Sequence, residues 1–339
     1  MAAYAAAAST ATRSLCRTGV LAAQCQRQDR PPTARAARVV AVPGTRGTAM
    51  SSETLPDLLE EALFAHPHDD VVLVEGDRRL TRGEVARRVT RVAAALAERG
   101  YSAGDRFVIW GANSLDWCIA ALAGSWLGMV SIPLSPAHGP RDLAPLLSLL
   151  RPPLFFVGDG VAGQALMTAL GGGRSWPVLP EVIHFGRDAN PTDLSLEHVE
   201  ANAEVTERFR SSARRTIDPE ETATILRTSG TTGEPKGVAH SHRSRVAYLR
   251  RVIQAPLRSA LCAPLAHALG QAQLYKGLLS GGCLALADGR TPQALAELLA
   301  RERIEYLSGP PSLFERLLAM SVDGRPVLGS LREVVLAAA

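Results

Sequence analysis

Small, hydroxylated and cationic residues gather in one run near the middle of the sequence, Thr-Ser-Gly-Thr-Thr-Gly-Glu-Pro-Lys-Gly, at residues 228–237. Its glycines permit positive φ and close backbone approach, which leaves amide N–H groups free to face anionic oxygens. The hydroxyl groups are further donors, and the lysine supplies a compact positive charge. This chemistry is suited to holding the phosphates of a nucleotide. The residues expected to contact phosphate are Thr228, Ser229, Gly230, Thr231, Thr232, Gly233, Lys236 and Gly237.

Two other phosphate-binding patterns do not fit this run. In G-x-x-x-x-G-K-[ST] the lysine follows the second glycine directly, whereas Glu234 and Pro235 come after Gly233 here. The dinucleotide fingerprint G-x-G-x-x-G also fails, because no glycine is placed to begin it. The remaining alternative is a mobile surface loop without function. This would be the favoured interpretation of a generic run of glycine, serine and threonine.

The loop must be held by the elements on either side of it. Apolar residues 223–226 indicate a buried strand, and a helical pattern resumes near His242. We therefore expect the loop to join a strand to a helix.

The rest of the chain alternates short apolar runs with helical patterns, which predicts parallel crossovers and an α/β fold whose parallel sheets are covered by helices. With 339 residues, 46% of them hydrophobic, the chain can bury a large core. We expect two subdomains, residues 50–215 and 216–339. Strands are predicted at 107–110, 129–133, 154–157, 261–264, 283–287, 304–308 and 334–337, and helices at 115–127, 141–150, 292–301 and 312–320.

The run at 228–237 and its continuation, Val-Ala-His-Ser-His, resemble the signature loop of the adenylate-forming superfamily. That superfamily includes acyl-CoA synthetases, luciferases and peptide-synthetase adenylation domains. Weaker matches, specific in their order and spacing, extend the resemblance over most of the chain. They lie at residues 80–85, 104–109, 113–114, 128–134, 264–267 and 309–311.

The resemblance implies a reaction with ATP. A carboxylic acid, expected to be a fatty or related apolar acid, would attack the α-phosphate and give an acyl-adenylate, with pyrophosphate as leaving group. Mg²⁺ would accompany the triphosphate, and coenzyme A is the implied acceptor, as in an AMP-forming acid–CoA ligase. Lys236 suits the stabilisation of charge on the departing oxygens and is the expected catalytic residue.

Other positions are expected to lie near the acyl pocket, because they match pocket positions in relatives. They are His267, Gly309 and Pro310. His267 could instead cap a helix. Lys276, the second of only two lysines, lies in a helical pattern where a solvated side chain is expected.

Relatives continue beyond the point where this sequence stops. Residues 331–339 resemble the strand before their adenine-binding turn; an aromatic-Gly-x-Thr-Glu segment, a ribose-binding aspartate and a C-terminal domain with a lysine follow in relatives. We expect the chain to be the front part of such an enzyme, truncated before the C-terminal domain. The alternatives are a catalytically inactive fragment and a nucleotide-binding module that needs a partner.

Residues 1–49 form a basic leader that we expect to be disordered. They hold seven arginines and one acidic residue, hence +6, whereas the remainder has 30 basic and 32 acidic groups, hence −2. Such a composition is typical of a transit peptide, or of an upstream region translated when Met50 is the true start. The expected location is the cytoplasm, or the mitochondrion if the leader is a transit peptide.

Several classes of protein gain no support from the sequence. The basic charge belongs to the leader, so no nucleic-acid partner is expected. No uninterrupted apolar run of about 18 residues appears, so no membrane span is predicted. The five cysteines have neither metal-like spacing nor a disulfide framework, and Cys118, Cys262 and Cys283 are expected to be core thiols. No metal ligands are assigned, and the oligomeric state is left open.

Overall fold

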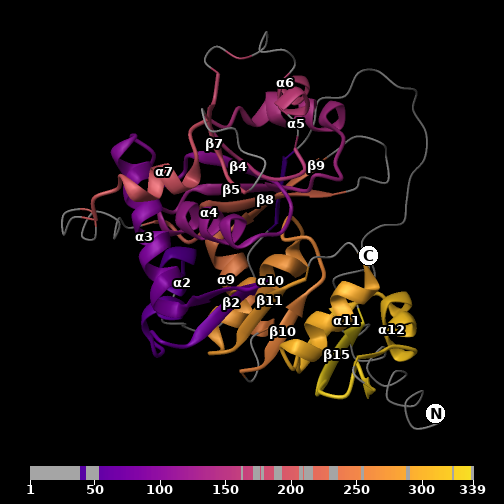
Figure 1. Cartoon of the computed structure of the whole chain (residues 1–339). Helices are drawn as coiled ribbons and strands as arrows, with labels where there is room; N and C mark the ends of the chain where they lie inside the picture. Colours follow the sequence, from indigo (N-terminus) through magenta and orange to yellow (C-terminus); the bar gives the residue numbers. More distant parts are fainter. Residues whose placement is uncertain are drawn as a thin grey trace. The chain divides into compact units, whose positions relative to one another are not determined.

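Two β-sheets with helices around them make up the computed structural model (Figure 1). All described residues belong to one unit of the chain. The structure describes residues 39–42 and, between 53 and 336, all residues except 162, 171–175, 177–178, 187–192, 206–208, 210–216, 229–235, 253–255, 288–290 and 323.

The first sheet has seven strands, and all its neighbouring strands run parallel except β8 and β9. Its middle strands are buried on both faces, as is typical of a parallel sheet covered by helices. In spatial order the strands are β1 (Val39–Val42), β9 (Lys236–Ser241), β8 (Thr222–Thr228), β5 (Val130–Leu134), β4 (Arg106–Trp110), β6 (Leu154–Val157) and β7 (Glu181–His184).

The second sheet has six strands and is parallel except for the β2–β3 hairpin. Its order is β15 (Glu333–Leu336), β12 (Tyr306–Gly309), β10 (Arg258–Leu261), β11 (Cys283–Leu286), β2 (Val71–Glu75) and β3 (Arg78–Thr81). A separate two-stranded ribbon pairs β13 (Ser321–Val322) with β14 (Arg325–Pro326).

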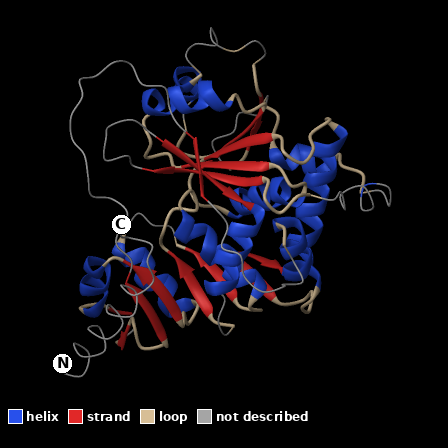
Figure 2. Ribbon diagram, turned by 180° about the vertical axis from the view of Figure 1, so that it is seen from behind, coloured by secondary structure: helices blue, strands red, loops and turns tan. Residues whose placement is uncertain are grey.

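Helices cover both faces of each sheet, and Figure 2 shows the sheets (red) with helices (blue) between them. Five helices pack between the sheets: α2 (Leu55–Phe64), α3 (Arg82–Glu98), α4 (Leu115–Trp126), α9 (His242–Val252) and α10 (Ala268–Leu279). The outer face of the first sheet packs against α5 (Pro140–Leu150) and α6 (Gly163–Ala169). The outer face of the second packs against α11 (Pro292–Arg301) and α12 (Pro311–Leu318). The short α7 (Leu196–Ala201) contacts α3.

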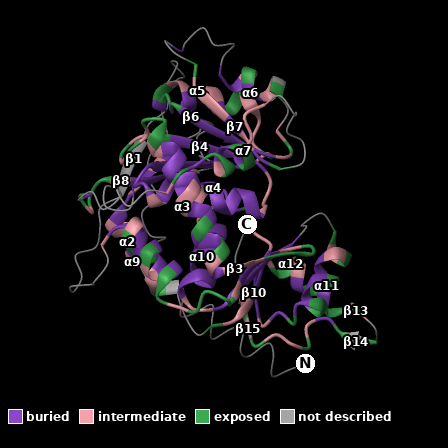
Figure 3. Cartoon of the chain, turned by 60° about the vertical axis from the view of Figure 1, so that its left-hand side comes forward, coloured by how far each residue is buried: buried purple, intermediate pink, exposed green. Residues whose placement is uncertain are grey.

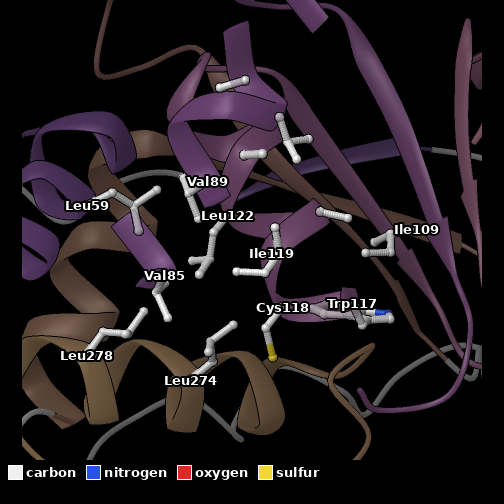
Figure 4. Close-up of a cluster of buried hydrophobic side chains, with 14 of the residues drawn as sticks. Leu59, Val85, Val89, Ile109, Trp117, Cys118, Ile119, Leu122, Leu274 and Leu278 are labelled. Atoms are coloured by element: carbon white, nitrogen blue, oxygen red, sulfur yellow. The ribbon is translucent and has the colours of Figure 1, made fainter. Parts of the chain in front are cut away.

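The largest hydrophobic core lies between the sheets and is built mainly from these inner helices (Figures 3 and 4). Figure 4 shows Leu122 of α4, Val89 of α3 and Leu278 of α10 among its side chains, all with 0% exposure. Because α10 contributes to a core that touches both sheets, the residues on it are positioned by long-range packing. Among the described helices, none has the length and apolar character needed to cross a bilayer.

The predicted α/β class with parallel, helix-covered sheets is confirmed, but the predicted boundary at residue 215 does not separate the sheets. β8 and β9, which follow that boundary, belong to the sheet formed by β4 to β7, and β2 and β3, which precede it, belong to the other sheet. The order of strands along the sequence does not show which sheet each strand joins, because that depends on pairing between distant segments.

Two further expectations need correction. Within the leader, residues 39–42 form β1, which pairs in parallel with β9 and covers what would otherwise be an unpaired strand edge. The strand predicted at 261–264 runs instead from Arg258 to Leu261. Its first residues are polar and find partners in the fold, since Ser259 donates to the Cys283 carbonyl and Arg258 pairs with Glu302.

Candidate active site

The two ends of the phosphate-loop sequence lie side by side at one end of a β-hairpin. Thr228 is the last residue of β8, Lys236 is the first of β9, and the two are register partners. The buried Gly237 is paired in the same way with Arg227. Of the predicted phosphate contacts, Ser229, Gly230, Thr231, Thr232 and Gly233 lie outside the described residues.

The loop therefore connects two antiparallel strands, and the expectation that it joins a strand to a helix is wrong. Helix α9 begins only at His242, after the six residues of β9. The backbone ladder between β8 and β9 holds Lys236 at the base of the loop, opposite Thr228, instead of at a helix N-terminus.

His267 stands at the N-cap of α10, so the alternative that it caps a helix is confirmed for its backbone position. Its side chain makes no capping hydrogen bond and is exposed. The preceding segment is anchored by Asn113, whose amide donates to the Ala263 carbonyl (3.0 Å) and whose oxygen accepts from the Leu265 N–H (2.8 Å). Asn113 follows β4, so this anchor ties the His267 loop to the first sheet.

His138 lies next to His267, and the sequence pattern offered no reason to select it. The two rings meet edge to face with centroids 6.2 Å apart. Burial, the nearby charge of Arg227 and His267 lower the pKa of His138 to about 4. The Nε of Arg227 is itself buried and finds no hydrogen-bond partner in the described part of the chain. Side chains from three separate segments thus converge near the end of β8, where the charge of Arg227 favours an anion.

The other predicted pocket residues lie at the end of β12. Gly309 is the buried last residue of that strand, and Pro310 is the N-cap of α12. One residue earlier, the hydroxyl of Ser308 accepts a hydrogen bond from the Gln273 amide of α10. Helix α10 therefore begins just after His267 and contacts the end of β12 through Gln273. The pocket role of His267, Gly309 and Pro310 stays a prediction.

Lys276 is buried, and the expectation of a solvated side chain is wrong. Its exposure is 5%, and its Nζ lies 3.6 Å from the centroid of the Tyr306 ring. Burial lowers the pKa of the ammonium group, and the charge of Glu333 partly offsets this. The helical pattern around Lys276 is the same for a surface helix and a central one, so only the position of α10 between the sheets decides its burial.

His242 is a buried histidine at the start of α9, with 1% exposure. Its Nδ1 accepts a hydrogen bond from the Leu55 N–H (3.2 Å), and its Nε2 has no partner among the described residues. Burial lowers its pKa to about 4, against a small opposing effect of Asp57. The neutral ring is therefore the form that fits the fold.

This histidine predicts a loss of stability in acid. Between pH of about 6.5 and 4 the unfolded chain binds a proton at His242 that the folded chain does not, so stability falls as the pH falls through that range. His242→Asn keeps an acceptor for the Leu55 N–H and cannot be charged, and should remove up to about 3 kcal/mol of this loss. Urea unfolding at pH 7 and pH 4.5 measures it, with the exposed His198→Asn as control. Equal acid sensitivity of His242→Asn and wild type would contradict the assignment.

The described residues give little support for metal binding or for cysteine chemistry. No group of three or more His, Cys, Asp or Glu side chains is arranged there to hold a metal ion. Cys118 and Cys283 are buried and Cys262 is half-buried, all as free thiols. Burial raises the pKa of the Cys262 thiol to about 12, so it has little nucleophilic character at neutral pH.

A two-sheet α/β fold with a Gly/Thr/Lys loop on a hairpin defines an AMP-binding fold of the adenylate-forming type. Residues 59–339 match the family model for AMP-binding enzymes, and the chain belongs to that family. The resemblance to the adenylate-forming superfamily is thereby confirmed.

The most similar proteins include acyl-CoA ligases. The chain is 29% identical to a 3-[(3aS,4S,7aS)-7a-methyl-1,5-dioxo-octahydro-1H-inden-4-yl]propanoyl:CoA ligase of Mycobacterium tuberculosis, over 84% of this chain and 57% of that protein. A mitochondrial medium-chain acyl-CoA ligase of Pongo abelii is 28% identical over 82% of this chain and 49% of its own length. The chain thus spans about half the length of these relatives.

Solved structures agree on the fold. The luciferase-like enzyme of the mealworm Zophobas morio superposes with a TM-score of 0.75 at 23% identity, covering 89% of this chain and 69% of that one. At this level of identity the likeness concerns the fold.

Proposed function

We propose that this protein takes part in the ATP-dependent activation of a carboxylic acid, first to an acyl-adenylate and then to an acyl-CoA. The observation that carries the proposal is the pairing of Thr228 with Lys236 at the base of the signature loop, in a chain of the AMP-binding family. The ligase names of its relatives support coenzyme A as the acceptor.

In this proposal each part of the loop acts on the triphosphate. Backbone N–H groups and hydroxyls of residues 228–233 hold the phosphates, while the ammonium group of Lys236 stabilises charge on the departing pyrophosphate. Mg²⁺ would accompany the triphosphate and would supply positive charge to its phosphates. We propose that the reacting acid approaches close to His267, whose ring contacts the neutral ring of His138. The charge of the nearby Arg227 would add positive potential for anionic groups.

The acid that we propose is a fatty or related apolar acid. Buried apolar side chains dominate the packing around α10 between the sheets. The name of the medium-chain ligase is consistent with this class. We propose the cytoplasm as the location, with mitochondrial import as the alternative if residues 1–49 act as a transit peptide.

Acid-dependent exchange of radioactive pyrophosphate into ATP tests the function. The assay uses the chain and the longest protein that its gene encodes, with acids of graded chain length and an acid-free blank. We expect exchange only with acid present, highest for a medium or long apolar acid. ATP binding without exchange in either protein would instead indicate the alternative of a nucleotide-binding module.

A further inference from the structure

A small cavity lies in the core among residues of α4, β5, β8, α9 and α10. Its volume is ≈ 20 Å³, which exceeds the roughly 10–15 Å³ that one water molecule requires. Much of the lining is apolar, but Trp117, Arg245 and Gln271 are among its polar members. No Asp or Glu is among the described residues that line it.

Arg245 is a buried cation with an incomplete set of partners. Its exposure is 3%, and one Nη donates to the side-chain oxygen of Gln271 (2.9 Å). The guanidinium carbon lies 5.6 Å from the centroid of the Tyr248 ring. Its Nε has no hydrogen-bond partner, and no carboxylate pairs with it, in the part of the chain that the structure describes. Arginine keeps its charge in proteins, so a buried guanidinium without a counter-charge is costly.

Trp117 of α4 is a second residue with an unpaired donor among those that line the cavity. Its exposure is 1%, and its indole Nε1 likewise has no partner among the described residues. Native proteins rarely leave two buried donors unpaired around one cavity, because each loses its hydration without a replacement. An acceptor group in the cavity would satisfy both donors, and a negatively charged one would also balance Arg245.

Three of the lining elements lead from the cavity to the candidate active site. Thr224 lies four residues before the end of β8, a span of about 13 Å. Gln271 is one helical turn after His267 on α10. Pro133 is on β5, which leads to His138. A molecule that reacts at the loop could therefore present its far end to Arg245.

We propose that this cavity is a binding site for a small anionic group, held by the guanidinium of Arg245 and the indole N–H of Trp117. The group is the distal carboxylate of a dicarboxylic acid substrate or a free inorganic anion. The dicarboxylic acid as source rests on the proposed function, whereas the free anion does not. If the substrate supplies the carboxylate, the site selects, among apolar acids, those that carry a second carboxylate at the far end.

Thermal unfolding of the full chain tests the site itself. Sodium formate or chloride replaces sodium gluconate, which is too large for the cavity, at constant ionic strength. Wild type should gain several degrees in Tm in a saturable manner, because a ligand of the folded state stabilises it. Arg245→Met should lose the response, and Trp117→Phe should weaken the apparent affinity at least about tenfold. Arg251→Met, an exposed change on the same helix, should respond like wild type.

Pyrophosphate exchange distinguishes the two sources. With a dicarboxylic acid and a monocarboxylic acid of equal length, Arg245→Met should lower kcat/KM at least about tenfold for the first alone if the substrate supplies the carboxylate. An anion-dependent Tm without such selectivity identifies a free anion. If no acid supports exchange while the anion still raises Tm, the site stands and the proposed function fails. The site is overturned if wild type shows neither the anion-dependent rise in Tm nor the selectivity for the dicarboxylic acid. It is also overturned if Trp117→Phe shows the same effects as wild type, and this comparison holds even if Arg245→Met does not fold.

Discussion

Lys236→Ala is expected to lower acid-dependent pyrophosphate exchange at least about 100-fold, because removal of one preorganised donor from a developing negative charge costs about that much or more. The β8–β9 ladder sets the backbone position of Lys236, opposite Thr228. The loss should appear mainly in the rate and less in KM for the acid, since the lysine is proposed to act on the departing phosphates. Steady-state exchange at saturating and limiting concentrations of the acid, with ATP saturating, measures both.

Two companion variants sharpen this result. Lys236→Arg keeps the charge but places it in a larger planar group, and should recover part of the activity. Arg251→Ala removes an exposed cation from α9 and should leave exchange unchanged. Near-normal exchange by Lys236→Ala, or a loss shared by Arg251→Ala, would refute the proposed role of Lys236.

Gly270→Ala is expected to give the largest loss of stability, of about 3 kcal/mol. Gly270 lies in the first turn of α10, and a Cβ there would overlap the Pro264 carbonyl oxygen and lie 2.7 Å from its carbonyl carbon. These are backbone atoms in a segment that Asn113 anchors through Ala263 and Leu265, so they cannot rotate away. The start of α10 would have to shift, together with His267.

Urea unfolding and nucleotide binding of Gly270→Ala measure this effect. The matched control is Gly163→Ala in α6, where a Cβ would meet nothing within 4 Å. Alanine is the better helix former by about 1 kcal/mol, so the control should be neutral or slightly more stable. Equal stability of the two variants would show that the contact between α10 and Pro264 is looser than described.

Elements with strong local signals were predicted well. The helix expected at 292–301 has those bounds in the structure, since Thr291 caps it and Pro292 occupies its first position. The strand expected at 154–157 is also reproduced, because it is a short apolar run bounded by polar and proline residues. In contrast, no strands were predicted for β2 and β3, whose hairpin carries the arginines Arg78 and Arg79.

Those arginines show why local patterns were insufficient. Arg79 pairs with Glu302 at 2.7 Å, and the same carboxylate also pairs with Arg258 and Arg301. Glu302 is only 3% exposed. These partners are up to 223 residues apart in sequence. The charged residues of β3 are therefore stabilised only when the fold brings their partners close.

The sequence by itself determined the class of protein and led to the prediction of a phosphate-binding loop. The prediction of a phosphate-binding loop depends on residue types at short spacing, from Thr228 to Gly237, and such spacing can be read without knowledge of the fold. Only the tertiary structure decided that the loop closes a hairpin, that Lys276 is buried against Tyr306, and that Arg245 and Trp117 share a cavity. Burial and charge pairing are set by distant segments packing together, so a local pattern does not contain them.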